Sequence, residues 1–157
     1  MRVQRIVGMA GVFCASTVVA TAFACIIGTQ FVLAGLTGLG VDVPLADRVS
    51  TTWYDIVNFG FVPSPAFGFS YAMVIGVGLF IAFLAAAALS YFLPRFRTVI
   101  YSVAGGIAIV TILGASFFVF GVVLFAFAQT PMGLISQAAA GAAGGWIFAT
   151  YSRQETE

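Results

Sequence analysis

The sequence predicts an all-α membrane protein whose four transmembrane helices form a compact bundle in a single domain, residues 1–157. The first observation is composition: 62% of the residues are hydrophobic and 7% are charged, whereas soluble domains are about 45–50% apolar and about 25% charged. The second is that four apolar runs each reach the roughly 20 residues that a helix needs to cross a bilayer. The third is that none of these runs contains Asp, Glu, Lys or Arg. The lipid bilayer is therefore the expected surroundings of most of the chain.

The predicted spans cover residues 6–36, 69–93, 99–127 and 132–151. The first span is much longer than the apolar part of a signal peptide, which has about 7–15 residues, so we interpret it as uncleaved. The third span would measure about 43 Å as a straight helix, against a bilayer core of about 30 Å. It is therefore expected to tilt, to project outside, or to bend near Gly114 or Gly121.

The connection between the third and fourth spans is predicted to be a tight hairpin with almost no external loop. Thr130 suits a helix N-cap, because its hydroxyl can accept from a backbone N–H of the first turn. Pro131 suits the first helical position, where no N–H is needed. A helix is therefore expected to begin at this pair.

The arginines predict the orientation of the chain. With both termini in the cytoplasm, five arginines lie inside and only Arg48 lies outside, a strong positive-inside bias. The five are Arg2, Arg5, Arg95, Arg97 and Arg153. The acids Asp42, Asp47 and Asp55 then face the other compartment.

The loop over residues 37–68 is predicted to contain a short amphipathic helix, residues 44–59, that lies on the outer membrane surface. Apolar residues recur at helical spacing, at Leu45, Val49 and Trp53. The polar residues fall on the other side: Asp47, Arg48, Ser50, Thr51 and Asp55. Trp53 and Tyr54 suit the headgroup layer, where a ring can be partly in water.

The same loop is the one place where outward-facing acids gather. Asp47 and Asp55 share the polar face of the predicted helix, but eight residues place their backbones about 12 Å apart, too far for one helix to pair them. The favoured interpretation is structural, with Asp47 near the positive end of the helix dipole. The alternatives are an interface with a partner, formed by Asp47, Arg48, Trp53, Tyr54 and Asp55, and a catalytic pair of carboxylates.

Small residues recur every four positions in each span, which predicts close helix packing. Spans associate through close contact and interhelical hydrogen bonds, since water provides no driving force inside a bilayer. These positions are Ser16, Ala20, Ala24 and Gly28 in the first span; Gly78, Ala82, Ala86 and Ser90 in the second; Ser102, Gly106 and Gly114 in the third; and Gly133, Gln137, Gly141, Gly145 and Ala149 in the fourth. Gly141 and Gly145 form a GxxxG pair.

Gln137 and Gln30 are the large polar side chains at membrane depth. Each is expected either to hydrogen-bond between helices or to contact a solute, and for Gln137 we favour the first. A proton-coupled carrier would need a buried acid or histidine, and the sequence has no His and no charge in its spans.

The remaining composition predicts no cofactor, no metal site and no nucleic acid partner. His is absent, and the net charge is +1, which gives little attraction for nucleic acid. Cys14 and Cys25 lie about 16 Å apart along one predicted helix, too far for a disulfide. No motif of a nucleotide-binding loop, a serine hydrolase or a zinc protease is present.

Two segments, LPRFR at residues 93–97 and GGWIFATYSR at residues 144–153, resemble a family of uncharacterised small four-span inner-membrane proteins of bacteria. The resemblance implies an arginine-bearing turn between spans two and three and a last span rich in Gly and Ala. It also implies a multi-pass location in the bacterial inner (cytoplasmic) membrane. It implies no activity.

Three functions are consistent with the sequence. The favoured one is a non-catalytic accessory, assembly or scaffold subunit that works with a membrane-protein partner or as a homo-oligomer. The second is a small oligomeric transporter or channel for a neutral or small solute, with Gln137 and Gln30 lining its path. The third is a membrane enzyme that acts on a lipid or quinone at the outer surface, using the loop that carries Asp42, Asp47 and Asp55.

Overall fold

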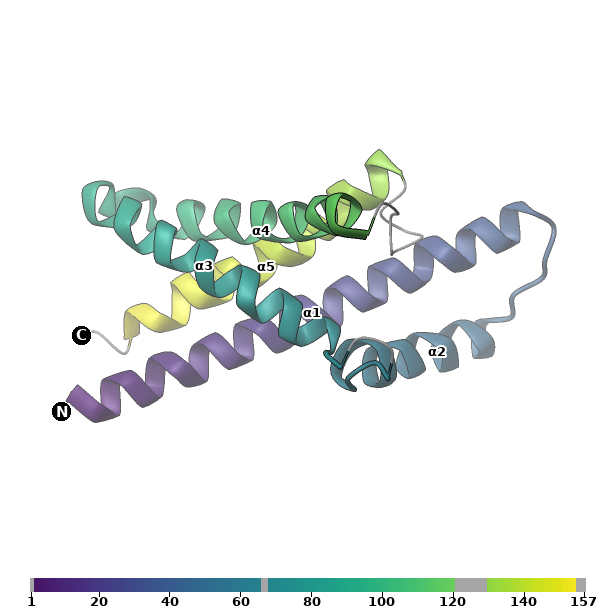
Figure 1. Ribbon diagram of the computed structural model, residues 1–157, viewed down its shortest axis with the longest axis horizontal. Helices are drawn as coiled ribbons and strands as arrows, with labels where there is room; N and C mark the ends of the chain where they lie inside the picture. Colours follow the sequence, from purple (N-terminus) through teal and green to yellow (C-terminus); the bar gives the residue numbers. More distant parts are fainter. Residues whose placement is uncertain (1, 66–67, 121–129, 155–157) are drawn as a thin grey trace.

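The structure is a computed structural model that describes residues 2–65, 68–120 and 130–154 (Figure 1). These ranges are helical apart from their connections and contain no strand. The elements are α1 Arg2–Gly38, α2 Leu45–Tyr54, the π-helix η1 Asp55–Phe61, α3 Tyr71–Phe92, the 3₁₀-helix η2 Pro94–Phe96, α4 Arg97–Phe120 and α5 Pro131–Gln154. The predicted all-helical class is confirmed for the described residues.

Among the described residues, three helices are long and apolar enough to cross a membrane, which is consistent with a membrane location. They are Ile6–Gly38, Tyr71–Phe92 and Pro94–Ser116. The fourth expected span, residues 132–151, falls within α5, which has 24 residues. α5 is less apolar than the three helices named above, because it is rich in Gly, Ala, Ser and Gln. Its hydropathy alone therefore does not identify it as a membrane span.

The ends of the third and fourth expected spans are only partly described. α4 runs as one helix through Gly114 to Phe120, with no break at that glycine. The remainder of the third expected span, including Gly121, lies outside the described residues. At the start of α5, the Thr130 hydroxyl accepts from the backbone N–H of Gly133 at 3.0 Å, and the helix begins at Pro131. The predicted cap and first position are both confirmed.

The four long helices contact one another in a ring. α5 packs along both α1 and α4, α4 packs along α3, and α3 closes the ring against α1. Figure 1 shows α3 crossing α5 and α1 at a large angle and diverging from α4. α1, with 37 residues, is about 55 Å long, and its C-terminal end extends past the ends of α3, α4 and α5 (Figure 1).

An aromatic cluster fills one level of the interior of the ring. Phe83 of α3 stacks on Phe148 of α5 with ring centroids 4.7 Å apart. Tyr101 of α4 lies 5.3 Å from Phe148 and 5.5 Å from Phe83, and Phe13 of α1 meets the edge of both phenylalanines. Each ring contributes a large buried area and the favourable edge or offset geometry of aromatic pairs, so one side chain from each long helix meets at this point.

α2 lies antiparallel along the projecting end of α1. It begins at Leu45, one residue after Pro44, and continues without a break into η1, which ends at Phe61. The helix predicted over residues 44–59 is therefore present. Its apolar residues Leu45, Val49 and Trp53 are 77%, 62% and 68% exposed, so this side of α2 is not covered by the rest of the chain.

Candidate functional site

A row of polar contacts, which we call the α1–α2 seam, joins the projecting end of α1 to α2 and η1. Arg48 Nη2 donates to the Thr37 hydroxyl at 2.9 Å. Gln30 Nε2 donates to the Thr52 hydroxyl at 2.9 Å. The Thr29 hydroxyl donates to Asp55 Oδ2 at 2.6 Å. Along α2 and η1 the residue numbers of these contacts increase, and along α1 the numbers of their partners decrease. The two segments therefore run antiparallel.

The seam turns part of the polar face of α2 and η1 toward α1, while Asp47 and Ser50 stay exposed. Arg48, Thr52 and Asp55 are spaced by four and three residues, so they lie on one helical face, and that face meets α1. A soluble helix does the reverse and buries its apolar face. The α1–α2 pair is therefore built with polar groups between its helices, as membrane-embedded pairs are.

Gln30 is occupied within this seam. Its amide nitrogen binds Thr52, and its Oε1 lies at a long 3.5 Å from Nη1 of Arg48. The Thr52 hydroxyl in turn donates to the carbonyl oxygen of Arg48 at 2.7 Å. Gln30, expected either to hydrogen-bond between helices or to contact a solute, therefore hydrogen-bonds α1 to α2.

Gln137 lies at the centre of the ring and is 0% exposed. Its Nε2 donates to the carbonyl oxygen of Ala24 in α1 at 2.9 Å. Its Oε1 accepts from the Tyr71 hydroxyl of α3 at 3.4 Å, a long bond. One side chain of α5 thus binds two other helices. Within the described part of the chain, every buried side-chain nitrogen and oxygen has a hydrogen-bond partner.

Gly141 and Gly145 lie where the backbone of α5 approaches the backbone of α4 most closely. A methyl group added at Gly141 would overlap the carbonyl oxygen of Gly105, and one at Gly145 would overlap that of Tyr101. Only glycine allows such an approach, since every other residue carries a Cβ. We call this contact between α4 and α5 the glycine seam.

A neighbouring face of α5 meets the small residues of α1. The Ser16 hydroxyl donates to the carbonyl oxygen of Gly144 at 2.5 Å. A methyl group at Gly144 would lie 2.9 Å from Cβ of Ala20. Ala20 and Ala24 are fully buried here. α5 therefore makes close backbone contacts on two sides.

The remaining small residues predicted to pack between helices differ in their exposure. Gly28, Gly133, Ala86 and Ala149 are buried, and Ala82 is half-buried. Gly78 is half-buried against Ile112 of α4. Gly114 is exposed, with no other part of the structure within 4 Å of an added methyl group, so it takes no part in the expected row of the third span.

Arg97 makes a cluster that the sequence did not indicate. Its guanidinium donates through Nη1 to the carbonyl oxygen of Ala149 and through Nη2 to the Ser152 hydroxyl at 2.7 Å. Its Cζ lies 5.1 Å above the ring of Tyr101. A cation at the C-terminal end of α5 also complements the helix dipole. The predicted arginine-bearing turn therefore binds the end of α5.

The three acids predicted to face outward, Asp42, Asp47 and Asp55, do not converge on one site. Asp42 and Asp47 are exposed, while Asp55 is half-buried against Thr29. Among the described residues, no group of three or more His, Cys, Asp or Glu is placed to hold a metal ion. Cys14 is exposed and Cys25 is buried, and both are free thiols.

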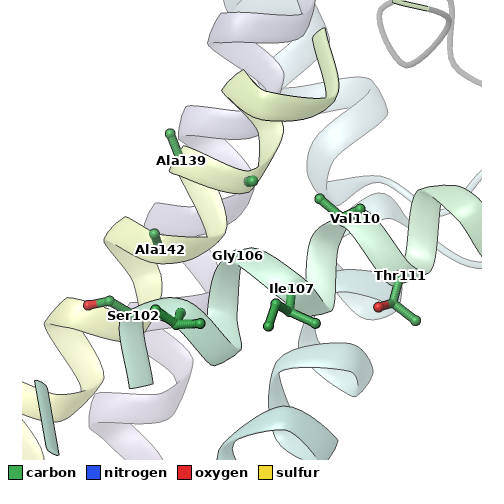
Figure 2. A pocket seen from close by; sticks show the side chains of 9 residues that line it. Ser102, Gly106, Ile107, Val110, Thr111, Ala139 and Ala142 are labelled. Atoms are coloured by element: carbon green, nitrogen blue, oxygen red, sulfur yellow. The ribbon is translucent and has the colours of Figure 1, made fainter. Parts of the chain in front are cut away.

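A shallow groove of about 440 Å³ runs outside the glycine seam. Figure 2 shows Ala139 and Ala142 on the α5 side and Ser102 and Gly106 on the α4 side. Small side chains make this face smooth. Thr111 lies at the end of the groove near α3.

Replacing Gln137 with leucine is expected to lower the free energy of unfolding by about 1–2 kcal/mol, because two interhelical hydrogen bonds are lost inside a dry bundle. Thermal unfolding in detergent measures this change. Ser136→Ala is the control, since the Ser136 hydroxyl only bonds back to Gly133 in its own helix. A solute-contacting role for Gln137 would instead give Gln137→Leu wild-type stability.

Comparison with protein-family models, with curated proteins and with solved structures gave no match.

Proposed function

We propose that the chain is a non-catalytic integral protein of the bacterial inner membrane that serves as an accessory, assembly or scaffold subunit. The observation that carries this proposal is the placement of Gln137. The one large polar side chain at the centre of the ring binds Ala24 and Tyr71, so it holds three helices together. Polar groups that served a passing solute would face a water-filled path instead.

We also propose that α5 is a fourth span and that both termini are cytoplasmic. With 24 residues, α5 is about 36 Å long and matches the bilayer core of about 30 Å. It lies between α1 and α4, each of which contains a segment apolar enough to cross. A helix flanked on two sides by membrane spans needs less apolar surface of its own, which accounts for its high content of Gly and Ala.

The proposed setting of α2 is the outer side of the membrane, beside the projecting end of α1. Because α2 runs antiparallel along that helix, it follows the span instead of lying flat on the surface. Its residues Arg48 and Thr52 are taken up by the α1–α2 seam, and its exposed residues Leu45, Val49 and Trp53 offer an apolar side to lipid. Asp47 and Ser50 lie on the remaining side, which is also exposed. A helix with separate apolar and polar sides is stable at the boundary between lipid and water.

Fluorescence of Trp53 tests this setting. In a Trp146→Phe background, Trp53 is the only tryptophan. We expect brominated lipids in nanodiscs to quench its emission strongly, because the ring would sit among the upper acyl carbons. The control moves the tryptophan to the polar side, as Ser50→Trp with Trp53→Phe, where quenching should be weak. Equal quenching at both positions would contradict an interfacial α2.

The scaffold role is tested by two measurements on the same preparation. Purification in mild detergent, with quantitative mass spectrometry, is expected to recover a membrane protein at a fixed ratio to this chain. Reconstituted liposomes are expected to show no protein-dependent flux of neutral solutes such as glycerol and urea. Recovery of the chain alone, together with a saturable flux, would favour the transport alternative.

A further inference from the structure

Two adjoining cavities meet at the start of α3. The first, which we call the head pocket, has a volume of about 550 Å³ and lies between η1, the following connection and α3. The second, which we call the chain groove, has a volume of about 670 Å³ and runs between α3 and α4. Both are lined by Phe69 and Val74, so the two cavities adjoin at these residues.

The head pocket is built by an unusual piece of backbone. Asn58 and Phe59 line it from η1, a π-helix of seven residues. Such helices are rare and occur frequently at functional sites. Phe69, which lines both cavities, is held by a backbone hydrogen bond: the N–H of Ser64 donates to the carbonyl oxygen of Phe69 at 3.1 Å.

The lining of the head pocket is aromatic and polar but uncharged. Tyr54, Phe59, Phe69 and Tyr71 supply rings, and Asn58 supplies an amide. Phe59 and Tyr71 lie with ring centroids 5.1 Å apart, so they form a continuous aromatic wall. A planar ring can stack on such a wall. A phosphate head is disfavoured, since burying an anion without a cation beside it is costly.

The chain groove is almost entirely apolar and opens toward the lipid side. Met73, Val77 and Ile81 line it from α3 at intervals of four residues and are 54%, 62% and 63% exposed. Ile107 faces them from α4. A hydrocarbon chain in this groove would contact both helices where they diverge.

We propose that the two cavities together bind an isoprenoid-quinone type of lipid, with its uncharged ring in the head pocket and its chain in the groove. The step from a neutral, ring-lined pocket to an apolar groove matches the polarity of such a molecule along its length. A volume of about 300–1,000 Å³ is usual for a small-molecule site. This binding site goes beyond the scaffold role and does not depend on it.

A photoreactive ubiquinone analogue with a short isoprenoid chain tests the proposal on the whole protein in nanodiscs. We expect saturable labelling that unlabelled decylubiquinone competes away. The labelled peptides should include η1 and the first half of α3. A photoreactive phosphatidylcholine at the same concentration should label the lipid-facing surface without saturation. Labelling by the quinone analogue that does not saturate, or that maps away from both cavities, would overturn the proposal.

Two variants of matched position sharpen the test. Ile81→Trp fills the chain groove, whereas Leu84→Trp changes a residue of the same helix that is 59% exposed and lies outside the groove. Ile81→Trp is expected to weaken quinone labelling about tenfold, the effect of about 1.4 kcal/mol. Leu84→Trp is expected to leave labelling unchanged, and equal losses in the two variants would contradict the assigned groove.

A third variant addresses the ring end of the ligand. Asn58→Leu removes the amide from the head pocket and should weaken labelling by up to about tenfold, as expected for one lost hydrogen bond. Asn58 is exposed and its Nδ2 bonds only to the Tyr54 carbonyl oxygen in its own helix, so the fold should survive. Wild-type labelling in Asn58→Leu would show that the ring does not enter this pocket.

Discussion

Gly141→Ala is expected to destabilise the protein, although alanine is normally the better helix former. The added methyl group would overlap the carbonyl oxygen of Gly105 and would lie 3.0 Å from Cδ1 of Ile109. The first of these atoms is backbone and cannot rotate away, so α4 and α5 must separate. Overpacking of this kind costs about 1–3 kcal/mol. Gly145→Leu, whose larger side chain meets the backbone of Tyr101, should remove most folded protein from the membrane.

The controls use glycines that lie in helices but outside any contact. Gly114 and Gly35 have no other part of the structure within 4 Å of an added methyl group. Gly114→Ala and Gly35→Ala should therefore leave stability unchanged or raise it by up to about 1 kcal/mol, the intrinsic preference of a helix for alanine. Membrane yield and thermal unfolding in detergent measure both sets. Equal stability of Gly141→Ala and Gly114→Ala would show that the glycine seam does not hold the helices together.

Arg97→Met is expected to lower the free energy of unfolding by about 2 kcal/mol, because hydrogen bonds from a charged donor are worth about 1.5–3 kcal/mol and this one is partly exposed. The variant loses the bonds to Ala149 and Ser152 and the contact with the Tyr101 ring. The end of α5 should loosen first, and hydrogen exchange of its last turn should report this.

Arg95→Met is the matched control for Arg97. Arg95 lies two residues earlier in the same turn and is exposed, so its loss removes the same charge without breaking the contact with α5. Arg97→Lys should fall between the two, because an ammonium group cannot reproduce the fork of the guanidinium. If Arg95→Met were as unstable as Arg97→Met, the effect would belong to membrane insertion, which depends on the arginine count, and not to the α4–α5 contact.

Local rules account for most of the elements. Apolar runs of sufficient length predicted helices at all four places where the structure has long ones, and Thr130 with Pro131 predicted the start of α5. The helix expected over residues 44–59 is present because Leu45, Val49 and Trp53 repeat with the helical period. These signals lie within a few residues of one another, and a sequence displays them directly.

Contacts between distant segments could not be read in the same way. The bonds of Gln137 reach Ala24 and Tyr71 in two other helices, and those of Arg97 reach Ala149 and Ser152 at the far end of the chain. The sequence shows that Gln137 needs hydrogen-bond partners if it is buried in an apolar helix. It does not show which of the many possible partners on the other helices provide them. Gly114 shows the converse, since it has the spacing of a packing residue and yet contacts no other helix.

The sequence by itself predicted that this chain is helical, that it has four apolar runs long enough to cross a membrane, and that its buried contacts use small residues and a few neutral polar groups. Composition and period carry that information, because each helix satisfies its own backbone. Of the corresponding helices in the described residues, three are apolar enough to cross. Tertiary structure alone decided that α5 lies between α1 and α4, that Arg48, Thr52 and Asp55 face α1, and that two cavities adjoin at Phe69. The reason is physical: hydropathy does not say which helix lies beside which, so the order around the ring follows from which small surfaces fit, and fit is a property of shape.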